Sequence, residues 1–127
     1  MRERSIIQGK SYKFSIRIIK LYQFLKTEKR EFVLANQILR CGTSIGANVD
    51  EASGGQSKRD FLHKLTIAYK EARETSYWLR LLKDTEFINE KMFESLKLDC
   101  DEILKIITKI QITVKNNLKK QLVTRNK

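Results

Sequence analysis

Apolar residues recur along this chain at alternating steps of three and four positions, which is the spacing of one face of an α-helix. Such runs cover residues 5–26, 30–53 and 90–118, and the clearest one covers 58–83. The pattern predicts four helices within a single domain over 1–127, with a basic, flexible tail at 119–127. The clearest run consists of Phe61, Leu65, Ala68, Ala72, Thr75, Leu79 and Leu82.

Polar residues and glycines mark the expected helix ends. Ser57, three positions before Asp60, forms a capping-box variant, and Asn89 is a good N-cap for the fourth helix. Gly54 and Gly55 are expected to end the second helix in the left-handed conformation. Because the connections are short, neighbouring helices are expected to be antiparallel. We therefore expect an all-α fold, an antiparallel up-down-up-down four-helix bundle.

The second helix carries two unusual features. Its apolar run places Asn48 in the core register, where an unpaired amide would cost about 1–3 kcal/mol. A partner is therefore expected, either Thr75 or a carboxylate. A buried polar cluster of this kind can fix helix register or subunit geometry. Gly42 and Gly46 each cost roughly 1 kcal/mol relative to alanine inside a helix, so they predict close approach of another backbone. A kink or a ligand groove is the alternative. The candidate carboxylates are Glu51, Glu71 and Glu74, with Arg40 and Arg73 available to neutralise them.

Two helices carry more apolar surface than one core needs. A second stripe on the third helix runs beside the core positions, and the first helix adds Tyr12, Ile16 and Ile19. A monomer would expose these side chains, which predicts self-association. Broad-faced packing inside one bundle is the alternative. The stripe on the third helix consists of Ile67, Glu71, Glu74, Trp78 and Leu81.

The net charge of +11 is concentrated near the two ends of the sequence. Residues 1–20 hold six bases and one acid, residues 103–127 hold seven bases and no acid, and the 13 bases and 14 acids of 21–102 nearly cancel. The expected topology brings both basic segments to one pole, which predicts an anionic partner. Favourable interaction with helix dipoles, or simple solubility, is the alternative. The candidate nucleic-acid-binding residues are Arg2, Arg4, Lys10, Lys13, Arg17, Lys105, Lys109, Lys115, Lys119 and Lys120.

The residues give little support for catalysis. A carboxylate-bridged di-metal bundle needs two Glu-x-x-His motifs, but the only histidine, His63, is expected to face outward. We therefore expect no catalytic residues, metal or cofactor. Cys41 and Cys100 are interpreted as buried thiols. The first residues lack the apolar run of a signal peptide, and no stretch approaches the roughly 20 apolar residues of a membrane span. A cytoplasmic location without membrane contact is expected.

Two segments carry a family resemblance. Gln37-Ile38-Leu39-Arg40 followed by Thr43-Ser44-Ile45-Gly46-Ala47-Asn48-Val49-Asp50-Glu51-Ala52 resembles the "Q-x-x-R…SIGAN-x-x-E" pattern of the four-helix bundle proteins named after 23S ribosomal RNA intervening sequences. The segment from Ser57 to Leu79 is similar to the third helix of that family. The resemblance implies a small bacterial protein that assembles as a homopentameric ring, and no established catalytic activity.

The resemblance also implies partners and roles. A related branch, the accessory variability proteins of diversity-generating retroelements, binds nucleic acid and a reverse transcriptase. We therefore expect a non-catalytic homo-oligomeric scaffold that binds RNA or DNA without reading sequence. The alternative is an adaptor for an acidic protein. Ala52 stands where the family usually has glycine, a departure that affects local packing. The residues expected to be structural or at the oligomer interface are Arg40, Asn48, Glu51, Ile67, Glu71, Glu74 and Trp78.

Overall fold

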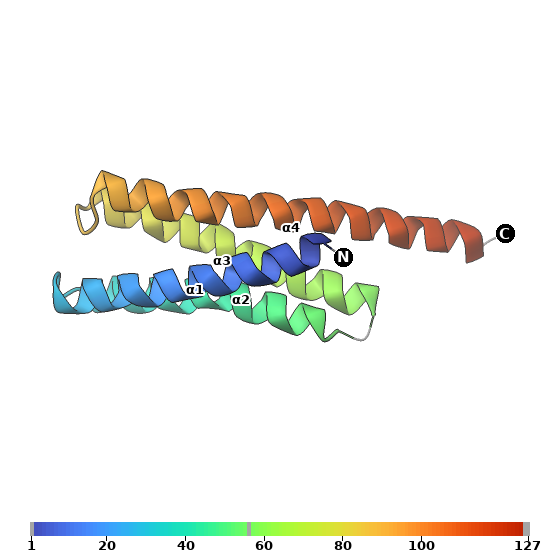
Figure 1. Cartoon of the computed structure of the whole chain (residues 1–127), viewed down its shortest axis with the longest axis horizontal. Coiled ribbons are helices and arrows are strands. Elements are labelled where there is room, and N and C mark those ends of the chain that lie inside the picture. The colour runs from blue at the N-terminus through green and yellow to red at the C-terminus, as the bar shows by residue number, and fades with distance from the viewer. Residues whose placement is uncertain (1, 56, 126–127) are drawn as a thin grey trace.

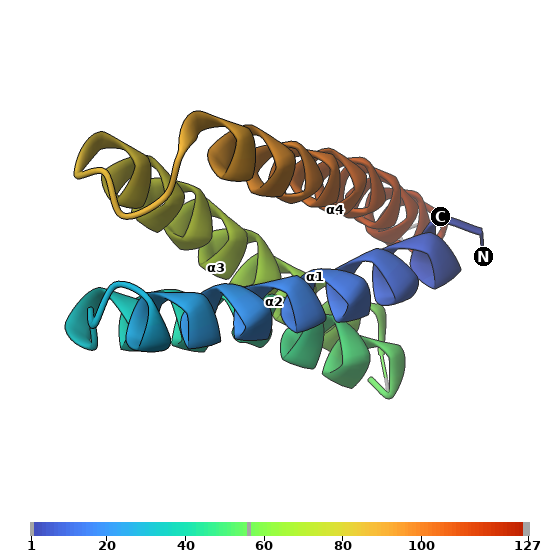
Figure 2. The same ribbon diagram turned by 60° about the vertical axis from the view of Figure 1, so that its left-hand side comes forward.

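The computed structural model describes residues 2–55 and 57–125, and it contains four helices and no strand within those ranges. Successive helices pack side by side, and α4 also contacts α1 (Figures 1 and 2). The predicted all-α, four-helix fold is confirmed. The helices are α1 (Arg2–Thr27), α2 (Val33–Ser53), α3 (Lys58–Asp84) and α4 (Glu90–Arg125).

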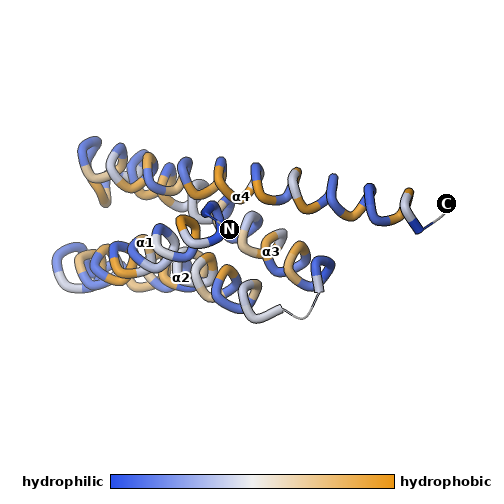
Figure 3. Tube along the Cα trace, turned by 45° about the vertical axis from the view of Figure 1, so that its right-hand side comes forward, coloured by the Kyte–Doolittle hydropathy of each residue, from blue (hydrophilic) through white to orange (hydrophobic). Residues whose placement is uncertain are grey.

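The core forms where the apolar spacing predicts it on three of the helices. Every predicted core position of α3 is buried. On α1 the predicted run from Phe14 to Leu25 is buried, and Ile7 and Ser11 extend it toward the start of the helix. On α4 the buried side chains follow the same spacing from Leu96 to Val114. Figure 3 shows the apolar positions of the helices turned toward one another.

The predicted core position of Asn48 is wrong. Val49 is 2% exposed and occupies that place, whereas Asn48 is half-buried and its Nδ2 donates to the Ser44 carbonyl at 2.8 Å within α2. Positions 48 and 49 lie three and four residues after Ile45, so helix periodicity alone allows either one. The apolar side chain takes the core position because it needs no hydrogen-bond partner there.

Two predicted caps are confirmed, and one predicted start is wrong. The Ser57 hydroxyl accepts from the Asp60 amide at 3.1 Å, and Asn89 Oδ1 accepts from the Met92 amide at 2.8 Å. The second helix begins at Val33 rather than at residue 30, because Arg30 has a φ of 50° and cannot continue a right-handed helix. The Glu31 carboxylate accepts from the Val33 amide at 3.0 Å and so caps the new start.

The glycines after α2 do not adopt the expected left-handed conformation. Gly54 has a φ of −90°, and no described glycine has a positive φ. A side chain at residue 55 would instead be crowded. A Cβ there would lie 3.0 Å from the Ala52 carbonyl oxygen and 3.4 Å from the Phe61 amide nitrogen. The loop is therefore held close to the first turn of α3.

The last helix runs further than the sequence pattern predicts. It continues to Arg125 instead of ending near residue 118, so residues 119–125 are helical, and 126–127 lie outside the described residues. No glycine or proline interrupts this stretch, and extending an existing helix is easier than nucleating one. Basic residues near its end also complement the helix dipole. Figure 1 shows this end of α4 reaching beyond the other three helices.

Candidate nucleic-acid interface

One pole of the bundle gathers several chain segments that are far apart in sequence. Figure 1 places the start of α1, the α2–α3 connection and the last third of α4 toward the same end. Contacts agree with this view. The Arg4 guanidinium lies 3.9 Å from the centroid of the Phe61 ring at the start of α3, and Lys109 Nζ of α4 lies 3.5 Å from Glu3 Oε1. We call this end the basic pole.

Three of the predicted nucleic-acid-binding cations pair with acids of the neighbouring helix. Lys10 Nζ lies 2.9 Å from Glu102 Oε2, and Lys109 pairs with Glu3. Arg17 Nη1 lies 2.6 Å from Asp99 Oδ2, and its guanidinium also donates to the Ser95 carbonyl and hydroxyl. These contacts link α1 to α4, so the three cations have a structural partner already.

The pKa values of two of these groups reflect the pairing. The hydrogen bond to Glu102, followed by the negative charge of that carboxylate, raises the pKa of Lys10. A hydrogen bond with its own backbone, followed by the charge of Lys109, lowers the pKa of Glu3. Both shifts favour the charged form, the ammonium of Lys10 and the carboxylate of Glu3.

Arg4 is also engaged within the chain. Its guanidinium stacks on Phe61, and its Nε is buried without a hydrogen-bond partner in the described part of the structure. A cation over an aromatic face is attracted by the ring quadrupole. Arg4 therefore joins the first turns of α1 and α3 and is a poor candidate for contact with phosphate.

The remaining predicted cations are exposed, and none forms an ion pair with another described residue. Two further cations at the same pole, Lys58 and Arg59, are exposed in the first turn of α3. The sequence interpretation missed them because it counted 21–102 as electrically balanced. The expected topology could have found them, since it places the start of α3 beside the end of α4. The exposed predicted cations are Arg2, Lys13, Lys105, Lys115, Lys119 and Lys120.

The predicted polar cluster between α2 and α3 forms without Asn48. Arg40 is hydrogen-bonded to Glu71 at 3.3 Å and also to Glu74. Trp78 Nε1 donates to Glu74 Oε2 at 3.1 Å. Arg40 therefore neutralises both acids, as predicted, and the cluster joins two helices of the same chain. Closer to the basic pole, Lys64 lies 3.6 Å from Glu51.

The exposed apolar face lies on α1 rather than on α3. Ile67 and Trp78 are half-buried, so the expectation that a monomer would expose the second stripe of α3 is wrong. Neighbouring side chains of the same bundle cover part of that stripe, and Trp78 packs against the core. By contrast, Tyr12 is 70%, Ile16 41% and Ile19 42% exposed.

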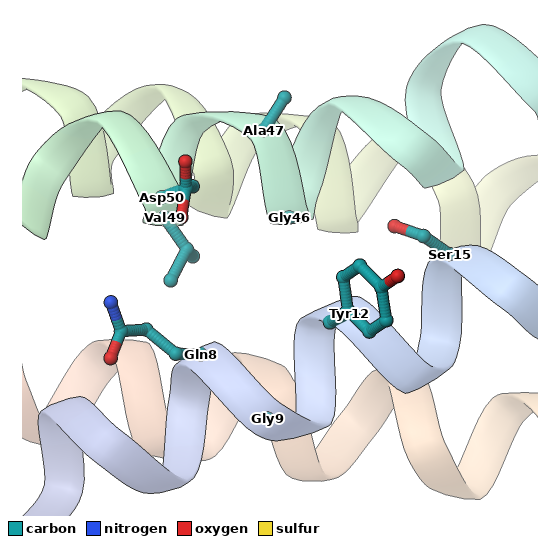
Figure 4. Close-up of a pocket in the computed structure, with 8 residues that line it drawn as sticks. All are labelled: Gln8, Gly9, Tyr12, Ser15, Gly46, Ala47, Val49 and Asp50. Atoms are coloured by element: carbon teal, nitrogen blue, oxygen red, sulfur yellow. The ribbon is translucent and has the colours of Figure 1, made fainter.

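A shallow groove of about 660 Å³ runs beside this face, between α1 and α2 (Figure 4). Gly46 forms part of its wall, with no side chain to fill it. A Cβ at that position would lie 3.1 Å from the Ser11 carbonyl oxygen of α1. The predicted close approach at the glycines of α2 is therefore confirmed, between two helices of one chain. Figure 4 shows Gln8, Tyr12 and Asp50 at the edges of the groove.

The chemically reactive side chains are buried, paired or isolated. Cys41 and Cys100 are buried as predicted, and burial raises the pKa of Cys41 to about 11 and that of Cys100 to about 12. Both thiols are therefore protonated at neutral pH and are poor nucleophiles. His63 is exposed, as expected from its register. Within the described ranges, no helix combines the length and apolarity that crossing a bilayer requires.

Comparison with known proteins identifies the family. The model of the 23S rRNA-intervening sequence protein family matches residues 3–109, which is most of the chain. The chain belongs to this family. The match includes the Arg40 cluster, the glycines of α2 and the whole of α3. It ends before the last turns of α4.

A solved protein from the S23 ribosomal protein family has the same fold as this intervening-sequence family protein. It is a protein of unknown function from Bacteroides thetaiotaomicron VPI-5482, with 50% sequence identity and a TM-score of 0.85. The similarity covers 86% of this chain and 97% of the other. No curated protein matches the chain. The family and the solved protein therefore establish the architecture and leave the biological role open.

Proposed function

We propose that this protein is a non-catalytic, homo-oligomeric scaffold that holds nucleic acid against its basic pole without reading sequence. The observation that carries the proposal is the gathering of exposed, unpaired cations from three helices at one end of the described structure. Arg2 comes from α1, Lys58 and Arg59 come from α3, and Lys115 and Lys119 come from α4. Each phosphate contact made by such a cation releases a counterion.

The proposed contacts are to phosphates rather than to bases. Phe93 is the last aromatic residue of the sequence, so no ring in the rest of α4 can stack on a base. Lysine presents a point charge, whereas sequence readout needs side chains aimed at base edges. A scaffold of this kind would bind many sequences with similar affinity and would release them at high salt.

The subunit of this scaffold is proposed to be an antiparallel up-down-up-down bundle. The contacts between α1 and α4 support this arrangement, since residue numbers rise along one helix as they fall along the other. Glu3 pairs with Lys109, Lys10 with Glu102, and Arg17 with Asp99.

The proposed assembly is a ring of copies, a pentamer by analogy with the family resemblance. Support comes from the exposed face of α1 with the groove beside it, because an apolar surface of this kind is typical of an interface. Sedimentation at micromolar concentration tests it directly, and a stable 15.0 kDa particle would contradict assembly. Ile16→Lys is expected to dissociate the oligomer. The matched variant Ile112→Lys, at an exposed isoleucine of α4, should leave it intact.

Nucleic-acid binding is tested by titrating labelled RNA and DNA at several salt concentrations. The logarithm of the association constant should fall with the logarithm of salt concentration, with a slope of about −0.9 for each phosphate contacted on duplex DNA. Replacing Arg2, Lys58 and Arg59 by glutamine should weaken binding to all sequences by a similar factor. Absence of binding at low salt would rule the proposal out.

A protein adaptor is the second candidate, and the exposed α1 face favours it. That face can bind a different protein as readily as a second copy, and the basic pole would then select an acidic partner. By the family resemblance, a reverse transcriptase is one partner of this kind. Partners that survive nuclease treatment in a pull-down, and that are lost in the Ile16→Lys variant, would favour the adaptor over the nucleic-acid scaffold.

A further inference from the structure

The last turns of α4 form a separate structural feature, residues 115–125, which we call the overhang. Val114 is 1% exposed and is the last buried residue of the helix, and every residue of the overhang is exposed or only half-buried. At 1.5 Å per residue the overhang is about 16 Å long. It projects beyond the other helices in Figure 1, and Figure 3 shows hydrophilic and apolar positions mixed along it.

The overhang lies outside the part of the chain that defines the family. The family match ends at residue 109, and the solved relative covers 86% of this chain but 97% of its own. The properties of the overhang therefore cannot be taken from the family. They have to be argued from its own side chains.

The overhang carries only positive charge. Lys115, Lys119, Lys120 and Arg125 contribute four cations, and no acid occurs after Glu102. None of the four forms an ion pair in the described part of the chain, in contrast to Lys10, Arg17 and Lys109. Four like charges on three helical turns repel one another, so an anion that bridges them would be stabilising.

The cations spread over more of the helix circumference than a flat surface can reach. At about 100° per residue, Lys119 lies roughly 40° from Lys115, Lys120 lies roughly 140° from it, and Arg125 lies roughly 80° away on the other side. The cations therefore span an arc of about 220°, which is more than half of the helix. Two rows of anionic groups, one on each side of the helix, can contact such an arc at the same time. A single flat anionic surface cannot.

The apolar residues of the overhang argue against a lipid surface. A helix that lies on a bilayer needs a continuous apolar face. Leu118 is half-buried against the core, so it does not belong to an exposed face. Leu122 and Val123 are adjacent, so they point about 100° apart, and Lys115 and Lys119 project between them. Placing Leu122 and Val123 in lipid would bury these two ammonium groups as well.

We infer that the overhang is a basic helix that enters the major groove of duplex DNA and contacts the phosphates on both sides. This groove is about 12 Å wide and admits an α-helix, whereas the major groove of A-form RNA is deep and narrow. The centre of the cationic arc lies about 150° around the helix from the mean direction of Ile110 and Val114, which face the core, so the bundle does not block the approach of the duplex to the three lysines. The inference rests on the proposed nucleic-acid function and adds the element and the kind of nucleic acid.

The test compares two triple variants that lose the same charge. In the first, Lys115, Lys119 and Lys120 become glutamine. In the control, Lys29, Lys70 and Lys91 become glutamine, all three of them exposed lysines away from the overhang. Binding to a 20-base-pair DNA duplex is measured from low to moderate salt. The overhang variant should lose about 3 units of the logarithmic salt slope, at about 0.9 per phosphate contact. The control should lose less than about half a unit.

A second variant separates a helix from a loose basic tail. Asn117→Pro keeps all four cations but interrupts the helix after the last buried residue. It should lower the thermal unfolding temperature of the bundle only slightly, because Leu118 is half-buried against the core, and it should reduce affinity for the DNA duplex by about tenfold or more. Binding equal to that of the parent protein would overturn the inference, because a flexible tail would then suffice.

The outcomes distinguish this inference from the proposed function. If the parent binds no nucleic acid, both fail. If the parent binds DNA and the two triple variants lose the same slope, the basic pole is still a binding surface but the overhang is not its DNA contact. Equal or tighter binding to an RNA duplex of the same sequence, or capture by phosphatidylserine vesicles, would overturn the assignment to DNA.

Discussion

Helix α1 is attached to its two neighbours by different kinds of contact. Toward α2 the helices touch through glycine, and a Cβ at Gly42 would lie 2.7 Å from Ile18 Cγ1. Toward α4 the contact is held by ion pairs at Lys10, Arg17 and Lys109. The α1–α4 contact is also the least extensive of the four helix pairs.

This difference determines how sensitive each contact is to a change in side-chain size and to salt concentration. Steric fit in a close-packed seam is short-ranged and indifferent to salt, so one added methyl group is felt. Exposed ion pairs contribute little each and are screened by salt. We therefore expect α1 and α2 to behave as one rigid unit. The attachment of α4 to α1 should be the weaker and the more adjustable of the two.

The largest expected effect is at Ile18, which is fully buried against Gly42. Ile18→Ala should destabilise the protein by about 2–5 kcal/mol, because it removes buried methyl groups and leaves a cavity. In a Gly42→Ala background the cost should be smaller, since the new methyl group occupies part of that cavity. A double-mutant cycle by urea unfolding measures this coupling. Strict additivity would show that the two residues do not form one steric contact.

The glycine contact itself can be isolated with a matched pair of substitutions. Gly9→Ala meets no atom within 4 Å and should stabilise α1 by roughly 0.5–1 kcal/mol through helix propensity. Gly42→Ala gains the same propensity but crowds Ile18. Its unfolding free energy should therefore lie about 1–3 kcal/mol below that of Gly9→Ala. Equal stabilities would show that α1 can move away from α2 without cost.

The two thiols test the burial of the core against α3, since Cys100 Sγ of α4 donates to the Ala72 carbonyl at 3.3 Å and Cys41 of α2 lies beside Thr75. Burial raises the pKa of Cys41 to about 11 and that of Cys100 to about 12, compared with about 8.5 when unfolded. Between these values the unfolded chain loses its protons first, so stability falls as pH rises from about 9 to 11. Each thiol contributes up to about 1.4 kcal/mol per pH unit.

Urea unfolding at pH 8, 9, 10 and 11 measures this slope. The variant with both cysteines replaced by alanine is the control for lysine and tyrosine titration, and its profile should be flatter than that of the parent. Two further variants each keep one of the two cysteines. The loss of unfolding free energy should continue to higher pH in the variant that keeps Cys100 than in the variant that keeps Cys41. Parallel profiles for the parent and the control would contradict the burial of both thiols.

The smallest effect is expected at the α1–α4 ion pairs. A double-mutant cycle with Arg17→Met and Asp99→Asn should give a coupling of about 0.2–1 kcal/mol, because both side chains are partly exposed. The coupling should diminish in 1 M salt. The Gly42–Ile18 coupling, measured in parallel, should not change. A salt-independent Arg17–Asp99 coupling would mean that this contact is more enclosed than its exposure indicates.

The local sequence was sufficient to predict the helices, the buried face of α3 and two helix starts. The spacing of apolar residues located four helices and the complete buried face of α3, because a regular helix repeats every 3.6 residues whatever surrounds it. Ser57 and Asn89 marked helix starts, because a cap acts within three residues of its own position.

Only the tertiary structure determined which polar side chains pair with each other and which residue takes an ambiguous core position. Periodicity left Asn48 and Val49 as equal candidates for one core position, and packing against the neighbouring helices selected the valine. The pairing of Lys10, Arg17 and Lys109 depends on the register between α1 and α4, which are remote in sequence. Contacts between helices depend on how the helices are placed relative to one another in space. The pattern of residues along the sequence does not contain this information.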